Sequence, residues 1–304
     1  MKHFIIRLMH FTLILLLILF FFISGIFISN RLLMLKCHIP GDADTLIVGD
    51  SHIMWSIDDS EIPRVKNISL NAEGYIYSYK KLNYILSRYP KVKYVYIGAG
   101  YHNFSDYYDN YIYGKQFQFF IQRYLGILNI DDYLQIIKRN KLADLPDFLI
   151  QIIRGGSKNI VKQECNLVSG FPEEKMTQTF NEEKMLARIS EQYFYKDGLR
   201  NVSALNVMYF KKLIDLCEEK NIKIIFLRTP VSSAYVSRVP LKFKEFYNDL
   251  INLYNISCFD FPNNNLGPGK FLPDGDHVNY YGSKIVTAEF KEYHERIKKN
   301  NSSY

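Results

Sequence analysis

The longest apolar run in the chain extends from Phe11 to Ile28 and contains no charged residue. A helix of roughly 20 apolar residues is long enough to cross a bilayer, and this one has no polar face to suit a buried core helix. Lys2 and Arg7 precede the run and no Ala-x-Ala-like cleavage site follows it, so residues 1–36 are predicted to be an uncleaved membrane anchor. Basic residues lie on both sides of the run, so charge alone orients the anchor weakly.

After a connector with Pro40 and Gly41, short apolar segments alternate with longer segments of helical periodicity. The predicted strands are Thr45–Val48, Val65–Leu70, Val92–Ile97, Lys223–Leu227 and Ser257–Phe261. The predicted helices are Tyr75–Arg88, Leu205–Lys220, Leu241–Tyr254 and Gly282–Lys299. Strands separated by helices indicate an α/β fold, with a parallel sheet covered by helices on both faces. We expect Thr45–Val48 and Val92–Ile97 to be neighbours in its centre, and a ligand to bind at the carboxyl ends of the strands.

From about residue 106 to residue 200 the alternation is interrupted by a segment rich in Tyr, Phe and Ile. Helical periodicity recurs there in Phe117–Leu128, Tyr133–Lys141 and around Phe148–Ile153, with interruptions at Gly155-Gly156 and at Gly170-Phe171-Pro172. We interpret the segment as a mostly helical subdomain inserted into a domain that fills residues 37–304. Two roles remain open for it, a lid over the strand ends or an elaboration of the packing.

The 304 residues carry a formal net charge of +7, but the lysines and arginines are scattered. No compact basic run with interleaved aromatic residues is present, so the charge is interpreted as solvated surface charge and no nucleic-acid partner is expected. The four cysteines (Cys37, Cys165, Cys217 and Cys258) are far apart and fit neither a zinc site nor a dense disulfide framework. They do not indicate a compartment, and no metal or organic cofactor is implied.

A candidate nucleophile follows the first predicted strand. Gly49 permits a tight turn after Thr45–Val48, and Ser51 then opens a possible helix. A serine at such a corner is accessible to substrate, and the positive end of the helix favours a developing anion. The alternative is that Asp50 or Ser51 only caps that helix, since both are preferred N-cap residues.

A candidate base and its orienting acid lie near the other end of the chain, in Asp274-Gly-Asp-His277. A serine hydroxyl needs a base to take its proton, and a histidine held by a carboxylate is the usual solution. Asp274 stands three residues before His277, so one turn places both side chains on the same side. Asp276 points elsewhere in most local conformations and is the weaker partner. The alternative is a polar loop in which His277 caps the last helix.

These motifs, in this order, resemble the GDSL/SGNH hydrolase superfamily: Gly49-Asp50-Ser51 after the first strand, a glycine after the second, and Asp274-x-x-His277 before the last helix. The resemblance covers roughly residues 43–296 without the inserted segment. It implies a three-layer α/β/α sandwich on a central five-stranded parallel sheet. It also implies that Ser51 is the nucleophile, His277 the base and Asp274 the residue that orients it.

The same resemblance implies an oxyanion hole formed by the backbone N–H groups of Ser51 and Gly74 and by an asparagine side chain. Here the sequence departs from the family, which has Gly-x-Asn-Asp after its third strand, whereas this chain has Gly98-Ala-Gly-Tyr101. Asn103 follows closely and is the candidate for the missing donor, with His102 as the alternative.

Members of this superfamily are mostly esterases, lipases and carbohydrate O-acetyl esterases or transferases. A membrane anchor followed by such a domain is similar to the branch that includes alginate acetylation proteins and the anchored protein of teichoic-acid D-alanylation. The resemblance implies an acylated cell-envelope glycan or polymer as substrate, a catalytic domain outside the cytoplasm, and a membrane acyl-transfer protein as a further partner. A hypothesis from another class is a non-catalytic glycan-binding or assembly protein that keeps the fold.

Overall fold

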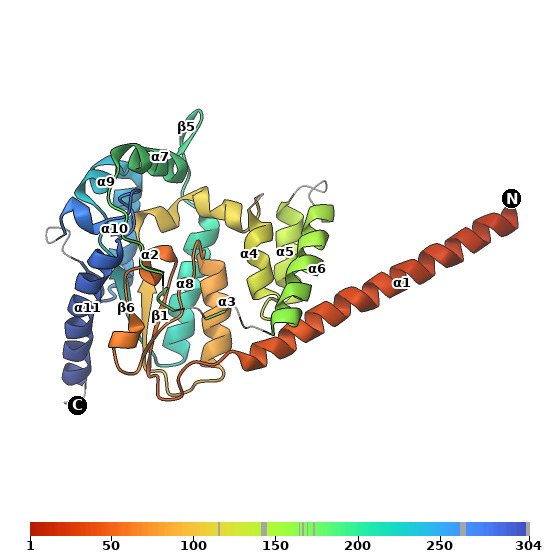
Figure 1. The fold of residues 1–304 in the computed structure, drawn as a ribbon, viewed down its shortest axis with the longest axis horizontal. Helices are drawn as coiled ribbons and strands as arrows, with labels where there is room; N and C mark the ends of the chain where they lie inside the picture. The colour runs from red at the N-terminus through yellow and green to blue at the C-terminus, as the bar shows by residue number, and fades with distance from the viewer. Residues whose placement is uncertain are drawn as a thin grey trace. The chain divides into compact units, whose positions relative to one another are not determined.

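The computed structural model describes residues 1–114, 116–140, 145–163, 165, 167–168, 170–172, 174–261 and 266–301. Lys141, the last residue of one predicted helix, lies outside these ranges. The chain divides into two compact units (Figure 1). Residues 1–37 and 115–166 form the first, which we call the helical unit, and residues 38–114 and 167–304 form the second, which we call the sheet unit.

The sheet unit is built on five parallel strands in the order β2-β1-β3-β6-β7. The strands are β1 (Thr45–Val48), β2 (Val65–Asn67), β3 (Tyr94–Gly98), β6 (Lys223–Arg228) and β7 (Cys258–Asp260). Strands β1 and β3 are neighbours, with Thr45 opposite Tyr94 and Val48 opposite Ile97. The prediction of a parallel sheet with these two strands side by side in its interior is therefore confirmed.

Helices cover both faces of this sheet because alternate strand residues point to opposite sides. On one face, Ile47, Tyr96 and Ile225 pack in one cluster with Val286 and Phe290 of α11 (Tyr280–Asn301). The other face is covered by α3 (Tyr75–Leu86), α8 (Ala204–Glu219) and α10 (Leu241–Tyr254). There the rings of Phe210 in α8 and Phe226 in β6 lie 5.1 Å apart.

Shorter elements of the sheet unit connect the strand ends. They are α2 (Ser51–Met54), α7 (Glu182–Tyr193), α9 (Ser233–Arg238), the antiparallel pair β4 (Phe194–Tyr195) and β5 (Gly198–Leu199), and the 3-10 helices η2 (Asp59–Glu61), η3 (Tyr101–Phe104), η4 (Asp106–Tyr111) and η7 (Pro268–Lys270). Helix α7 and η4 both come from the segment predicted to be an insertion, and they contact each other within the sheet unit.

The helical unit contains α1 (Lys2–Leu33), η1 (Met34–Lys36), α4 (Phe117–Tyr124), α5 (Ile130–Arg139) and α6 (Leu145–Lys162). Helix α1 is long and apolar enough to span a membrane. The predicted insertion therefore divides between the units: residues 115–166 associate with α1, and its remaining residues belong to the sheet unit. Sequence periodicity shows where the helices lie but not with which partner each one packs.

The glycine pair Gly155-Gly156 lies inside α6 and does not interrupt it, contrary to the interpretation made from the sequence. A Cβ atom at Gly155 would lie 2.4 Å from the Gln122 side chain of α4, and one at Gly156 would lie 2.3 Å from the side chain of Ile26 in α1. The pair thus lets two helices approach α6 closely. Beside it, the buried Asn30 accepts a hydrogen bond from Asn159 at 2.9 Å.

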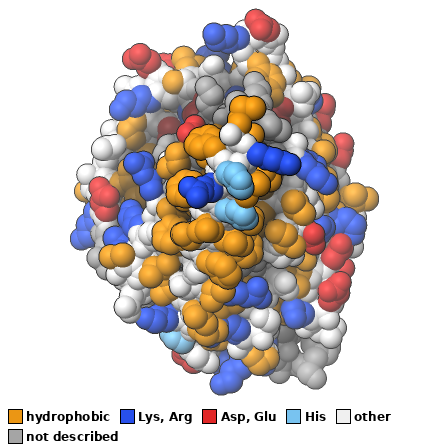
Figure 2. All heavy atoms as spheres, turned by 90° about the vertical axis from the view of Figure 1, so that its right-hand side faces the viewer, with side chains coloured by type: hydrophobic (Ala, Val, Ile, Leu, Met, Phe, Trp, Pro, Cys, Tyr) orange, Lys and Arg blue, Asp and Glu red, His pale blue; other side chains and the backbone are white. Residues whose placement is uncertain are grey.

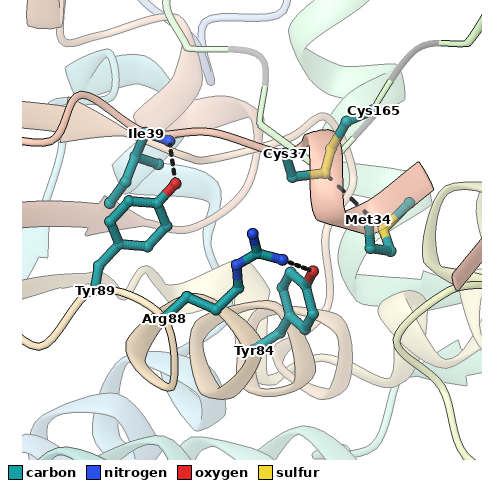
Figure 3. Close-up of a disulfide and its surroundings, with 7 residues drawn as sticks. All are labelled: Met34, Cys37, Ile39, Tyr84, Arg88, Tyr89 and Cys165. Carbon is teal, nitrogen blue, oxygen red and sulfur yellow. Dashed lines mark hydrogen bonds between the residues drawn. A yellow bond between two sulfur atoms is a disulfide. The ribbon is translucent and has the colours of Figure 1, made fainter. Parts of the chain in front are cut away.

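A disulfide bond joins Cys37 to Cys165 within the helical unit, with their Cα atoms 5.3 Å apart (Figure 3). Cys37 directly follows η1, which continues from the end of α1. Cys217 is a buried free thiol and Cys258 a partly buried one. The bond closes a loop of 128 residues, a separation from which spacing alone does not predict a pairing.

Candidate functional site

Ser51 lies at the corner between β1 and α2, at the carboxyl end of the sheet. The corner is possible because Gly49 and Gly98 lie against each other and against Ile53. A Cβ atom at Gly49 would come within 2.7 Å of Ile53 Cγ1 and within 3.3 Å of the Gly98 Cα. Asp50 is the N-cap of α2, and its carboxylate accepts the backbone N–H of His52 at 2.9 Å. Ser51 is therefore both the first helical residue and partly exposed.

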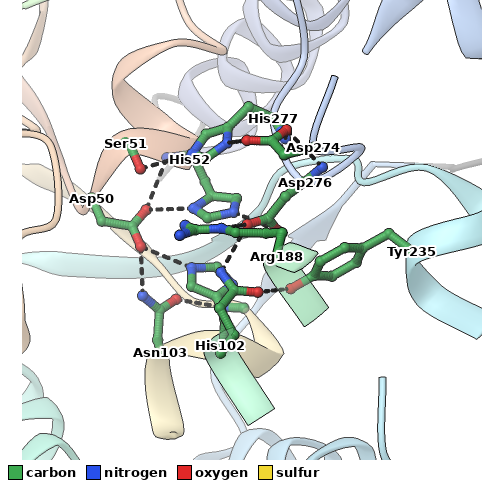
Figure 4. A network of polar contacts seen from close by, with 12 residues as sticks. Asp50, Ser51, His52, His102, Asn103, Arg188, Tyr235, Asp274, Asp276 and His277 are labelled. Atoms are coloured by element: carbon green, nitrogen blue, oxygen red, sulfur yellow. Dashed lines mark hydrogen bonds and ion pairs between the residues drawn. The ribbon is translucent and has the colours of Figure 1, made fainter. Parts of the chain in front are cut away.

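The structure brings Ser51, His277 and Asp274 together (Figure 4). Ser51 Oγ lies 2.8 Å from His277 Nε2, and His277 Nδ1 lies 2.8 Å from Asp274 Oδ2. The other oxygen of Asp274 accepts the backbone N–H groups of Asp276 at 3.1 Å and His277 at 3.2 Å, which fixes the turn before α11. Burial alone would raise the pKa of Asp274, but His277 beside it lowers that pKa below its ordinary value. A carboxylate on Nδ1 leaves Nε2 free to accept the proton of Ser51.

The three residues expected to form an oxyanion hole lie in different environments. As the first residue of α2, Ser51 has a backbone N–H without an acceptor inside that helix. Gly74 is the N-cap of α3, where helix N–H groups are likewise free of helical partners. The Asn103 side chain is engaged elsewhere: its Nδ2 donates to Asp50 Oδ2 at 2.8 Å and its Oδ1 accepts the Gly100 N–H at 2.8 Å. In Figure 4 Asn103 lies on the side of Asp50 away from Ser51.

A buried polar network that the sequence did not reveal lies behind the candidate triad. Asp50 is its first centre. One carboxylate oxygen faces Nδ1 of His52 at 3.1 Å, and the other accepts hydrogen bonds from His102 Nε2 at 2.8 Å, Asn103 and Tyr108. Burial would raise the pKa of Asp50, but the positive charge of His52 and the contacts with His102 lower it well below its ordinary value.

Asp276 is the second centre of this network and is fully buried. Its Oδ1 lies 2.7 Å from His52 Nε2, an ion pair whose angle falls short of a hydrogen bond. Its Oδ2 accepts hydrogen bonds from Arg188 Nε at 2.9 Å and Gln192 Nε2 at 2.8 Å. Burial would raise the pKa of Asp276, yet His52 and Arg188 hold it well below the ordinary value. As predicted, Asp274 and not Asp276 is the carboxylate that pairs with His277 Nδ1. Asp276 is instead a centre of the buried network.

His52 joins the two centres and is a cation at neutral pH. Each of its ring nitrogens lies within 3.1 Å of a carboxylate oxygen, so both nitrogens carry a proton. Burial disfavours the charged ring, but Asp276 and Asp50 raise the pKa of His52 to about 10. The ring is stacked between two others, with centroids 3.7 Å from His102 and 4.2 Å from His277. The plane of the candidate base therefore rests on the charged His52 ring.

The ligand-type atoms of Asp50, His52 and His102, and those of His52, Asp276 and His277, lie close enough together to suggest a metal site. Their contacts argue otherwise. Both oxygens of Asp50 already accept hydrogen bonds, and both nitrogens of His52 face carboxylates. Two carboxylates are balanced by the charges of His52 and Arg188, so these residues form a neutral hydrogen-bonded and ion-paired assembly.

The triad residues were predicted from the sequence, whereas most of the network was not. Asp50, His52 and Asp276 directly adjoin Ser51 and His277 in the sequence, and this position was the only signal for them. Arg188 and Tyr108 come from the segment predicted to be an insertion, and no sequence pattern predicts their hydrogen bonds to Asp276 and Asp50. No protein-family model matches this chain, and no curated protein is detectably similar to it.

Proposed function

We propose that this protein is a membrane-anchored serine enzyme that hydrolyses or transfers acyl esters. The observation that carries the proposal is the contact chain Ser51 Oγ, His277 Nε2, His277 Nδ1, Asp274 Oδ2, in which both hydrogen-bond distances are 2.8 Å. Ser51 attacks an ester carbonyl while His277 takes its proton and then returns it to the leaving alcohol. The backbone N–H groups of Ser51 and Gly74 are the proposed donors to the oxyanion.

The sheet unit supports an SGNH-type three-layer sandwich as the finer description of the fold. Its five strands are parallel, the serine follows β1, Gly74 follows β2, and the Asp-x-x-His segment precedes α11. Nucleophile and base come from opposite ends of the chain and meet at the carboxyl edge of the sheet, where α/β folds bind ligands. No cofactor is needed for this chemistry.

The substrate class that we propose is an acylated glycan or polymer of the cell envelope, with a membrane acyl-transfer protein as a further partner. Helix α1, which is long and apolar enough to span a membrane, supports a substrate at the cell envelope. The disulfide between Cys37 and Cys165 supports a location outside the cytoplasm, because such bonds persist in oxidising compartments.

The test of the proposal is an active-site serine probe applied to the purified full-length chain. A fluorophosphonate is expected to label the wild type and the Ser60→Ala control, in which an exposed serine is removed, but not Ser51→Ala. Ester turnover on acetylated glycans and model esters should follow the same order. Labelling that persists in Ser51→Ala would place the reactive serine elsewhere.

The topology is tested by counting reactive cysteines. In chain extracted from cell membranes, denatured without reductant and treated with a maleimide–polyethylene glycol, only Cys217 and Cys258 are expected to react. After reduction all four cysteines should react, and Cys37→Ser should expose Cys165 without reductant. Four reactive thiols in the unreduced wild type would contradict an oxidising location for the residues that follow the anchor.

One observation favours the second candidate, a glycan-binding or assembly protein without catalysis. The Asn103 amide, the candidate for the third oxyanion donor, is committed to Asp50 and Gly100. Loss of one such donor lowers rates by about 10²–10³. A wild type that neither reacts with the probe nor turns over any ester, but binds the glycan, would establish this second candidate.

A further inference from the structure

Large apolar side chains are exposed on α5 and α6 of the helical unit. Ile130 and Leu134 of α5 are 70% and 44% exposed, and Leu149 and Ile150 of α6 are 41% and 47% exposed. Contiguous apolar surface of this kind marks a contact with a partner or a membrane. Figure 2 shows one face of the molecule, on which hydrophobic side chains gather with few acidic ones among them.

The exposed apolar residues of α6 form a stripe along that helix. At about 100° per residue, the exposed or half-exposed Pro146, Leu149, Ile150, Ile153, Ile160 and Val161 fall on one side of the helix. The exposed charged residues Arg154, Asp147 and Lys158 lie along one edge of this stripe, two of them basic and one acidic. Helices with an apolar face and a lysine- and arginine-rich polar face lie in the membrane interface.

The other edge of the stripe on α6 is the side that contacts α1. Gly156, which lies against Ile26 of α1, borders the stripe at Leu149 and Ile160 on the helical wheel. The same arrangement holds on α5, where the Tyr133 ring lies 5.1 Å from that of Phe27 in α1. Ile130 and Leu134 are next to Tyr133 on the wheel, and Asp131 and Lys138 lie beyond them. Each stripe therefore borders the side of its helix that contacts α1.

Helices α5 and α6 contact α1 at Ile26 and Phe27, near the end of its long apolar run. A span of about 20 residues that begins after Arg7 ends near Phe27. The side chains of α1 up to Phe22 are exposed, and the first buried one is Ile26, which contacts α6. Helices α5 and α6 thus contact the anchor where it leaves the bilayer. We propose that the apolar stripes of α5 and α6 lie in the lipid interface, with Arg154 and Lys158 at the level of anionic headgroups.

The proposal is tested by lipid quenching of single tryptophans in the full chain, because its only tryptophan, Trp55, can be replaced by phenylalanine. Ile150→Trp and Gln151→Trp form a matched pair of adjacent positions, one in the stripe and one outside it, and Leu134→Trp and Gln135→Trp form a second pair. Each variant is reconstituted into phosphatidylcholine–phosphatidylglycerol vesicles with or without brominated acyl chains. Phe20→Trp, within the span, confirms insertion.

Bromolipid quenching of Ile150→Trp is expected to exceed that of Gln151→Trp by roughly twofold or more, since interfacial helices bury their apolar face about 5–10 Å into the headgroup–acyl boundary. Leu134→Trp should exceed Gln135→Trp in the same way. Strong quenching at Phe20→Trp with equal and weak quenching at all four other positions would overturn the proposal. The stripes would then be covered by something other than lipid, such as a membrane protein.

Discussion

Replacing Asp276 by asparagine is expected to lower the free energy of unfolding by about 3 kcal/mol or more and to abolish ester turnover at the same time. The Asp276 carboxylate is fully buried and faces His52 and Arg188, so an uncharged side chain leaves two buried cations without their shared partner. The free energy of unfolding is measured by urea denaturation of the full chain in detergent. The matched variant Asp274→Asn removes a partly exposed carboxylate and should lose turnover with a far smaller loss of stability.

The Asp276→Asn variant should also change how stability depends on pH, and the raised pKa of His52 sets the direction of that change. The pKa of His52 is raised to about 10 from an ordinary value of 6.5, so its stabilising contribution is complete below pH 6.5 and is lost as the pH rises toward 10. One retained proton corresponds to a slope of about 1.4 kcal/mol per pH unit in that window. Asp276→Asn removes one of the two carboxylates and should flatten the slope, whereas Asp274→Asn should keep it.

A result that would contradict this account is an Asp276→Asn variant as stable as the wild type with an unchanged slope. His52 would then not be held as a cation by Asp276, and the ion pair between them would not contribute to the free energy of unfolding. On the acidic side, the lowered pKa values of Asp50 and Asp276 mean that their contribution is present above about pH 3.8 and is lost as the pH falls.

The contrast between Asp274 and Asp276 shows what the sequence could and could not reveal. A spacing of three residues placed Asp274 beside His277, because that relation depends only on one turn of backbone. The role of Asp276 depends on Arg188 and Gln192, which are more than 80 residues away in the sequence. Local spacing carries no information on such contacts, so the sequence ranked Asp276 as the weaker carboxylate and did not predict its structural role.

The sheet was predictable for a similar reason. The strands around Val48 and Ile97 are short apolar runs between helical segments, and alternation of this kind leaves few topologies. The helical periodicity of α6 was also visible, but Gly155-Gly156 was read as a break because the close approach of α1 and α4 is a tertiary property. The association of residues 115–166 with α1 depends on the same contacts.

Ser51→Ala and His277→Ala are each expected to reduce ester turnover by a factor on the order of 10⁶, and the double variant by no more than either single one. The reason is that Ser51 Oγ and His277 Nε2 share one proton across 2.8 Å, so neither side chain functions without the other. Asp274→Asn should cost about 10⁴, because an asparagine favours the wrong tautomer of His277. Turnover is measured with one acylated glycan and one model ester under identical conditions.

The double variant distinguishes two side chains that act as one unit from two that act independently. If its loss equals the product of the two single losses, the two side chains act independently and the triad is assigned wrongly. Ser60→Ala serves as a control, because an exposed serine outside the site should leave turnover unchanged. Thermal unfolding of every variant separates lost chemistry from lost folding, since Ser51 is partly exposed and His277 is buried but 9% exposed, whereas Asp276 lies fully buried at the centre of the site.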